Sequence, residues 1–328
     1  MSGPTILPFD DAAIARAATS IKAGGIVAVA TETVYGLAAD ATNPDAVARI
    51  YAAKGRPSFN PLIVHVSDLA AAQQLAIFDE RARALAEAFW PGPLTLVLPV
   101  RAEAGLAPAV TAGLTTVAVR VPAHRAMRAL LAASGRPLAA PSANRSGAIS
   151  PTTAQHVAAS LGAAAPLVLD DGPCSAGLES TIVKDGRVLR PGPITAEQIA
   201  EAGSRAGGNP ETPAVLPEAL GSRLRGSTMI TAPGQLDSHY APNKPLRLNA
   251  TTAEPDEWLI GFGPIAGDDT LSESGDLQEA ATRLFAALHR ADDAGKPRIA
   301  VAPVPPTGLG EAINDRLRRA AHGSSPRP

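Results

Sequence analysis

Lys54 and Arg56 open a stretch whose residue types suit an anion-binding site. The stretch begins as a loop, ends as a strand, and reads KGRPSFNPLIVH over residues 54–65. Side chains of an extended chain alternate, so Lys54 and Arg56 are expected to point to the same side. Lysine supplies a point charge and arginine a planar fork, a pairing that suits polyphosphate. The alternative is a solvated loop beside a strand.

The end of this stretch predicts a buried strand. Leu62, Val64 and Val66 would share one face, and His65 would lie on the other. An ordinary, partly buried strand histidine is the alternative interpretation of His65.

Two further segments carry polar groups at strand spacing. If the strand at 26–30 continues, Thr31, Thr33 and Tyr35 form a polar strip, although β-propensity alone accounts for such residues. In the strand at 116–121 the valines form one face, and Thr116 and Arg120 the other. Arg120 could lie in solvent, or it could hold a carboxylate with both arms of its guanidinium.

A small-residue strand near residue 138 opens into a polar loop. Ser142 and Asn144 have the same two-residue offset as Lys54 and Arg56. Ser150 precedes Pro151, which predicts a helix capped by Ser150 with the proline at its first position. A cap explains Ser150, and a phosphate at that helix N-terminus would fit equally well.

The elements that must position these residues alternate between helix and strand. Helices are expected near 10–23, 44–53, 79–89, 124–133 and 195–202. Residues 203–242 are rich in Gly, Pro and Ser and read as a linker. Strands near 246–248, 258–262 and 299–302, with helices near 276–293 and 308–321, predict a small α/β domain. The predicted division is 1–205, 206–242 and 243–328.

Composition limits the classes of function. The 328 residues are 45% hydrophobic and 18% charged, which predicts well-formed cores. The net charge of -2 and an aromatic content of 3% argue against nucleic-acid binding through a positive field or stacked bases. Cys174 is the only cysteine, so a cytoplasmic protein without a cysteine zinc site is expected. No signal or membrane-spanning pattern is evident, and neither common phosphate-binding loop is present.

The ordered set of segments is more specific than any one of them. It resembles the signature blocks of the threonylcarbamoyl-AMP synthase family, the YrdC-like proteins. The segments that carry the resemblance are Thr31–Leu37, Lys54–His65, Thr116–Pro122, Ala140–Asn144, Glu179–Ile182 and Leu189–Gly192. Residues 239–242 and 308–321 look like the longer, two-domain members. Gln235 departs from the methionine often found at that position.

The resemblance implies a fold and a reaction. The fold is a twisted mixed sheet with surrounding helices and a cationic concave cavity, followed by a small Rossmann-like domain. The reaction condenses L-threonine, bicarbonate or CO2, and ATP to threonylcarbamoyl-AMP and pyrophosphate, with Mg2+. A separate machinery then transfers the threonylcarbamoyl group to an adenosine beside the anticodon of certain tRNAs. No stable nucleic-acid binding by this chain is expected.

The resemblance also implies roles for particular residues. Lys54 and Arg56 are the predicted catalytic cations. The predicted threonine-binding residues are Thr33, His65, Arg120, Ala140 and Ser180. The predicted ATP-binding residues are Lys54, Arg56, Asn60, Thr116, Ser142, Asn144, Ser150, Arg190, His239 and Tyr240. No residue is assigned as a metal ligand.

Other interpretations remain open. A cationic cavity can also hold an RNA backbone without catalysis. A carbamoyltransferase subdomain is a second alternative, although such relatives are normally longer and carry zinc-finger-like segments. Residues 227–242 are predicted to close over the cavity as a lid, and the alternative is a passive tether.

Overall fold

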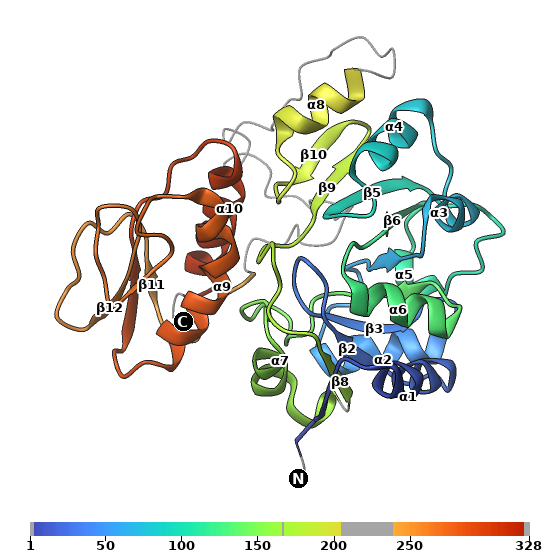
Figure 1. Cartoon of the computed structure of the whole chain (residues 1–328), viewed down its shortest axis with the longest axis horizontal. Helices are drawn as coiled ribbons and strands as arrows, with labels where there is room; N and C mark the ends of the chain where they lie inside the picture. Colours follow the sequence, from blue (N-terminus) through green and yellow to red (C-terminus); the bar gives the residue numbers. More distant parts are fainter. Residues whose placement is uncertain (1–2, 166, 205–238, 325–328) are drawn as a thin grey trace.

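The structure, a computed structural model, describes residues 3–165, 167–204 and 239–324, and it contains two sheets (Figure 1). We call residues 3–204 the N-terminal part and residues 239–324 the C-terminal part. Most of the predicted linker and lid, residues 205–238, lies outside the described residues. The predicted domain boundaries therefore stay predictions.

The N-terminal part is built on a mixed sheet. Among the described residues the strand order is β1-β8-β2-β3-β7-β4-β6-β5-β9-β10. The strands are β1 (Thr5–Pro8), β2 (Val27–Val29), β3 (Gly36–Asp40), β4 (Ile63–His65), β5 (Leu94–Pro99), β6 (Thr116–Arg120), β7 (Leu138–Ala139), β8 (Leu167–Asp170), β9 (Thr181–Lys184) and β10 (Arg187–Arg190). The sheet contains both parallel pairs, such as β4 with β6, and antiparallel pairs, such as β2 with β3. The mixed sheet predicted for this part is confirmed.

Helices surround this sheet, and side-chain caps mark where many of them begin. They are α1 (Asp11–Lys22), α2 (Pro44–Lys54), α3 (Leu69–Leu75), α4 (Glu80–Phe89), α5 (Pro108–Thr111), α6 (Arg125–Ser134), α7 (Ala154–Leu161) and α8 (Ala196–Ser204). Asp10 caps α1 by accepting a hydrogen bond from the Ala13 amide, and Asn43 caps α2 in the same way. Gly55 ends α2 with a φ of 58°, a left-handed conformation that glycine adopts without strain.

The prediction of a helix beginning at Pro151 is wrong. Helix α7 begins at Ala154, and its cap is Thr153, whose hydroxyl accepts a hydrogen bond from the amide of His156. Thr153 also meets the N-cap preference, and the Ser150 hydroxyl is engaged with another side chain instead.

The strand near 26–30 does not continue through Tyr35, so the polar strip that depended on that continuation does not form. Residues 30–35 turn the chain from β2 into the antiparallel β3. The hydroxyl of Thr31 accepts hydrogen bonds from the amides of Thr33 and Val34, which stabilises this turn. Tyr35 does not lie beside Thr31 and Thr33 in a polar strip. Its hydroxyl instead donates a hydrogen bond to Asp170 on β8.

The alternation predicted for residues 62–66 is confirmed. Leu62, Val64 and Val66 belong to the main apolar core, and His65 borders a cavity that Leu62 also reaches. Burial of each aliphatic side chain contributes about 1.5–3 kcal/mol relative to exposure. This energy holds β4 in register and so fixes the direction of His65.

The C-terminal part has a parallel sheet in the order β11-β14-β12-β13. Its elements are β11 (Leu246–Arg247), β12 (Glu257–Gly261), β13 (Asp269–Thr270), α9 (Leu277–Asp293), β14 (Arg298–Val301) and α10 (Leu309–Gly323). Both helices lie between this sheet and the N-terminal part (Figure 1). The alternating helices and strands predicted here are present.

The two parts share an apolar contact. Val34, Ile149 and Leu178 of the N-terminal part pack in one buried cluster with Tyr240 and Phe285. Gly177 lies so close to α9 that a Cβ atom there would meet the carbonyl oxygen of Ala281 at 2.5 Å. Within the described residues, no helix is long and apolar enough to cross a membrane.

Candidate functional site

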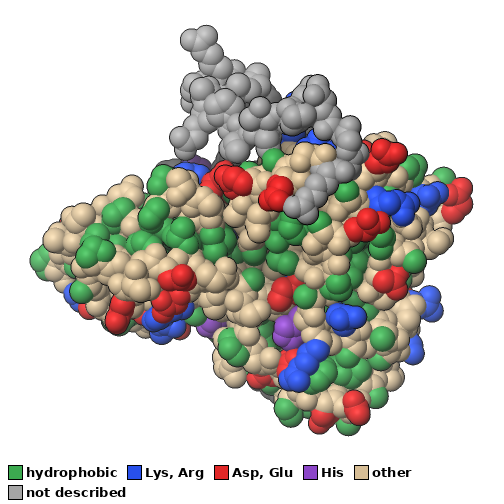
Figure 2. All heavy atoms as spheres, turned by 45° about the horizontal axis from the view of Figure 1, so that its top comes forward, with side chains coloured by type: hydrophobic (Ala, Val, Ile, Leu, Met, Phe, Trp, Pro, Cys, Tyr) green, Lys and Arg blue, Asp and Glu red, His purple; other side chains and the backbone are tan. Residues whose placement is uncertain are grey.

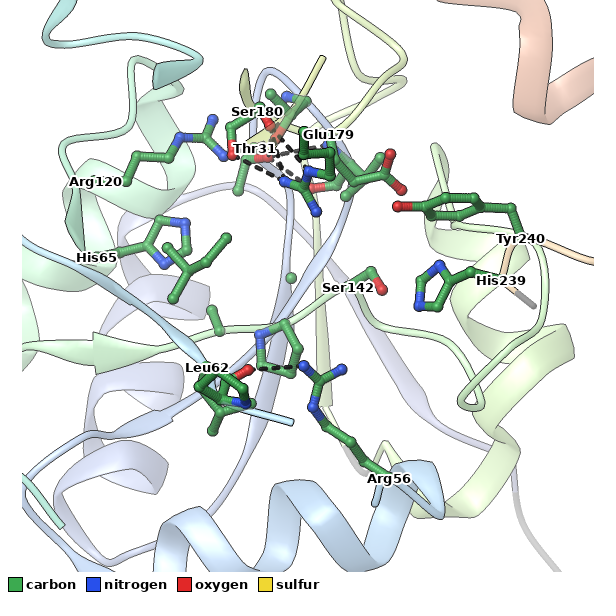
Figure 3. Close-up of a pocket in the computed structure, with 18 residues that line it drawn as sticks. Thr31, Arg56, Leu62, His65, Arg120, Ser142, Glu179, Ser180, His239 and Tyr240 are labelled. Atoms are coloured by element: carbon green, nitrogen blue, oxygen red, sulfur yellow. Dashed lines mark hydrogen bonds between the residues drawn. The ribbon is translucent and has the colours of Figure 1, made fainter. Parts of the chain in front are cut away.

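A cavity lies where the ends of β2, β3, β4, β6 and β7 approach residues 179–180 and 239–240 (Figure 3). Ten of the predicted site residues line it: Thr33, Arg56, His65, Arg120, Ala140, Ser142, Ser180, Arg190, His239 and Tyr240. They come from segments up to about two hundred residues apart, so the fold brings together most of what the sequence predicted.

Arg56 reaches the cavity from the loop after α2. Its Nε donates to the backbone oxygen of Asn60 at 3.1 Å, and its Nη2 donates to Asn60 Oδ1 at 2.7 Å and to the Pro61 oxygen at 2.8 Å. None of these three hydrogen bonds uses Nη1. The side chain is therefore held firmly while one donor end stays available toward the cavity (Figure 3).

Lys54 takes a different place from Arg56. Helix α2 includes Lys54 and Gly55 is left-handed, so the extended alternation that would put both cations on one side does not occur. The ammonium donates to the backbone oxygens of Ser142 and Asn144, both at 2.5 Å, and it is not among the residues that line the cavity. Burial, followed by the charge of Arg56, lowers the Lys54 pKa well below its usual value. Lys54 thus fixes the loop that carries Ser142.

Arg120 ends β6 inside the cavity and is paired. Its Nη2 donates to Glu32 Oε1 at 2.6 Å, its Nη1 to the Thr33 hydroxyl at 2.9 Å, and its Nε to the Gly92 oxygen at 3.1 Å. Burial alone would raise the pKa of Glu32, but the charge and hydrogen bond of Arg120 outweigh it, so the pKa is lowered. The guanidinium is held in one orientation beside Thr33.

His65 is a neutral, buried side chain at the same end of the cavity. Burial, together with the charge of Arg120, lowers its pKa to about 3. Its Nδ1 has no hydrogen-bond partner among the described residues. A buried polar atom without a partner is uncommon, and here it leaves a free group beside the cavity.

Arg190 and Ser180 form a second polar group. Arg190 donates from Nε and Nη2 to the backbone oxygen of Ser180, at 3.2 and 2.9 Å. The Ser180 hydroxyl lies 2.7 Å from that of Thr95. Gly192 permits this arrangement, because a Cβ there would meet the amide nitrogen of Thr181 at 2.5 Å.

His239 and Tyr240 close the opposite side of the cavity from His65 and Arg120 (Figure 3). Their rings meet edge to face with centroids 4.1 Å apart, and Tyr240 also packs on Phe285 of α9 at 5.6 Å. Both are buried, and neither the Tyr240 hydroxyl nor the His239 Nδ1 has a partner among the described residues. Ala241 bonds through its amide to the Gly147 oxygen, which anchors this end of the predicted lid.

Four other predicted ATP-binding residues do not line the cavity. Asn60 supports Arg56, and Asn144 donates to the oxygens of Arg145 and Ala148. Ser150 donates to Glu179 at 2.5 Å. Thr116 lies at the far end of β6 from Arg120. Apart from Thr116, these residues contact residues that line the cavity or the backbone of the loops that carry the lining residues.

Thr31 and Glu179 line the cavity but were not predicted as site residues. Both lie in segments that carried the family resemblance, so their position in those blocks was the available signal. Glu32, the partner of Arg120, lies in the same block as Thr31.

The charges of the cavity favour an anion. Arg56, Arg120 and Arg190 line it, and Glu179 is the only carboxylate among the described lining residues. Acidic and basic side chains are instead interspersed over the outer face shown in Figure 2. The described residues contain no group of three or more His, Cys, Asp or Glu that could hold a metal. Mg2+ usually binds through one or two carboxylates together with substrate phosphates.

The fold and the cavity define a class: an α/β protein whose mixed sheet carries an arginine-lined cavity. The family described as "Telomere recombination" (Sua5, YciO and YrdC) matches residues 19–192. The family described as "Threonylcarbamoyl-AMP synthase, C-terminal domain" matches residues 194–322.

Comparisons with individual proteins point to the same family. The chain is 39% identical to a threonylcarbamoyl-AMP synthase of Bacillus subtilis, over 97% of this chain and 95% of that protein. It is 38% identical to one of Pyrococcus abyssi, over 93% of each. The crystal structure of P. abyssi Sua5 complexed with L-threonine superposes with a TM-score of 0.86 at 35% identity, covering 98% of both chains.

The chain therefore belongs to the threonylcarbamoyl-AMP synthase family, whose members are enzymes. The predictions of the family and of the α/β fold with a mixed sheet are confirmed.

Proposed function

We propose that the cavity is the site at which L-threonine, bicarbonate or CO2, and ATP are joined to give threonylcarbamoyl-AMP and pyrophosphate. The observation that carries the proposal is one cavity with two polar ends. Arg120, Thr33 and His65 form one end, and Arg56 and Tyr240 lie across from them (Figure 3).

The end around Arg120 suits L-threonine. Arg120 carries a fixed positive charge for the carboxylate, although part of that charge is offset by Glu32. The free Nδ1 of neutral His65 and the hydroxyls of Thr33 and Ser180 offer hydrogen bonds. Ala140 also lines this region, and its role would be through the backbone.

The other end suits the triphosphate and nucleoside of ATP. Arg56 lines this end, and Arg190, which also bonds to Ser180 of the threonine end, adds a second buried cation. Ser142, His239 and the unpartnered hydroxyl of Tyr240 supply polar contacts. Lys54, Asn60, Asn144 and Ser150 would act by holding the lining residues, and Thr116 has no place in this scheme.

The mechanism is a matter of alignment and charge neutralisation. The threonine amine attacks CO2 and loses a proton, which gives a carbamate. A carbamate oxygen then bonds to the α-phosphorus of ATP, and the bond from that phosphorus to the leaving pyrophosphate breaks. Fixed guanidinium groups stabilise the charge that moves to the phosphate oxygens.

The test is release of pyrophosphate from ATP with and without L-threonine and bicarbonate. Both should be required, and pyrophosphate rather than orthophosphate should form. Orthophosphate release that does not depend on threonine would refute the proposal. A steep salt dependence of tRNA binding without any turnover would favour the RNA-binding alternative. Use of the product by a tRNA-modifying machinery, and Mg2+ as companion of ATP, are parts of the same proposal.

A further inference from the structure

Arg316 is a fully buried arginine of α10 that reaches from the C-terminal part to the wall of the cavity. Its side chain is 0% exposed. Nε donates to Glu179 Oε2 at 2.8 Å, Nη1 to Asp315 Oδ2 at 2.7 Å, and Nη2 to the backbone oxygen of Pro191 at 2.9 Å. Arginine is rarely buried without partners. Two of these partners, Glu179 and Pro191, belong to the N-terminal part, in segments that line the cavity.

The first of these partners, Glu179, brings a negative charge into the cavity. Its carboxylate is buried, with Oε2 on Arg316 and Oε1 accepting from the Ser150 hydroxyl at 2.5 Å. It is the only carboxylate among the described residues that line the cavity. In a buried site charges are weakly screened, so an unpaired Glu179 would repel a phosphate strongly. Arg316 offsets that charge from the α10 side of the cavity, and Asp315, the other carboxylate that it contacts, is also paired with Arg319.

Arg316 also contacts the face of Tyr240. Its guanidinium carbon lies 5.2 Å from the centroid of the Tyr240 ring, within the range of a cation–π interaction. Tyr240 packs on Phe285 of α9 as well. The C-terminal part therefore holds a cavity-lining ring through both of its helices.

We propose that Arg316 is a positioning residue through which the C-terminal part prepares the cavity for a polyphosphate ligand. It does so by neutralising the charge of Glu179. The inference rests on the proposed function for the ligand's identity. Arg56 and Arg190 attract the phosphates, and this attraction is effective because Arg316 removes the opposing charge of Glu179.

The test measures how strongly full-length Arg316→Met binds adenosine, AMP and ATP by calorimetry. Because the cause is charge, the loss of affinity should grow with the charge of the ligand. We expect a loss of about 10-fold or more for ATP, a smaller loss for AMP, and a change below about 3-fold for adenosine. Adding Glu179→Gln to Arg316→Met should restore ATP affinity to within about 5-fold of wild type.

Arg298 provides the matched control. It lies in the same part of the chain and forms ion pairs with Glu254 and Asp256, but at the surface. Arg298→Met should bind all three ligands as the wild type does.

Each other outcome has a defined meaning. Equal losses for the three ligands, or no recovery in the double variant, would show a packing role and overturn the inference. If Arg316→Met does not fold, the double variant decides: folded protein with near-normal ATP affinity supports the inference, and failure to fold or to bind overturns it. Failure of the wild type to bind ATP would instead refute the proposed function.

Discussion

Arg120 and Glu32 form a buried ion pair, with 2.6 Å between Nη2 and Oε1, that joins β6 to the turn after β2. The pair fixes the direction of the guanidinium and also offsets part of its charge. Arg120 is thus oriented beside Thr33 before any substrate arrives.

The first prediction follows from this pair. Arg120→Ala should raise the threonine concentration needed for half-maximal rate far more than the ATP concentration. Arg120→Lys should rescue only partly, because a point charge cannot replace the fork that bonds Glu32 and Thr33 together. Steady-state kinetics with each substrate varied in turn would measure both effects.

Arg125 is the control for this prediction. It pairs with Asp171, and its side chain is 73% exposed. Arg125→Ala should leave both substrate requirements unchanged. A folded Arg120→Ala enzyme with normal threonine dependence would show that Arg120 does not contact threonine.

The second prediction separates Arg56 from Lys54. Arg56→Ala should reduce turnover by roughly 30- to 1000-fold, as expected if it contributes about 2–4 kcal/mol to the transition state, with a smaller fall in melting temperature than Lys54→Ala, because Arg56 is only half-buried. Lys54→Ala should reduce turnover and also lower the melting temperature, because the ammonium holds the carbonyls of Ser142 and Asn144. Turnover assays and thermal unfolding of both variants test this difference. Equal melting temperatures would mean that Lys54 does not stabilise the loop.

The third prediction concerns the hydroxyl of Tyr240. It is buried and has no partner among the described residues, so its removal should cost the free protein little stability. Tyr240→Phe should therefore melt like the wild type but bind ATP more weakly, by about 1 kcal/mol or roughly 5-fold if one hydrogen bond is lost. Tyr240→Ala should also destabilise the protein, because the ring packs on Phe285. Unchanged ATP affinity in Tyr240→Phe would exclude a contact from the hydroxyl.

The fourth prediction concerns pH. His156 on α7 stacks on His289 on α9 with ring centroids 3.9 Å apart, and His289 Nε2 lies 3.2 Å from the Ser150 oxygen. Burial, then the charges of His289 and Arg290, lowers the pKa of His156 to about 3, and burial lowers that of His289. The unfolded chain therefore takes up protons near pH 6.5 that the folded chain does not. The contribution of these two histidines to the free energy of unfolding should be complete above about pH 6.5 and should be lost progressively as the pH is lowered toward 3.

Thermal unfolding between pH 7.5 and 5 measures this effect. The double variant His156→Gln, His289→Gln should lose less stability over this interval than the wild type, because two of the groups that prefer protonation in the unfolded chain are gone. His322 on α10 has an exposed position and serves as the control, so His322→Gln should keep the wild-type pH dependence. An unchanged slope in the double variant would refute the prediction.

Local pattern was enough to predict much of this protein. The alternation of Leu62, Val64 and Val66 placed His65 on the side of the sheet that faces the cavity, because period-two alternation and burial act together. The apolar periodicity of 276–293 and 308–321 located α9 and α10 to within about two residues. The ordered blocks identified the family, and most of the residues predicted from them line one cavity.

Only the tertiary structure decided the direction of individual cations and the partners of buried charges. A left-handed Gly55 at the end of α2 turned Lys54 away from Arg56, and no strand alternation could predict that. The contact between Arg316 and Glu179 joins residues 137 positions apart, across the two parts of the chain. Such a pairing depends on how helices and strands pack in three dimensions. Each of the two charges needs the other only because packing buries both of them, and local sequence carries no signal for that burial.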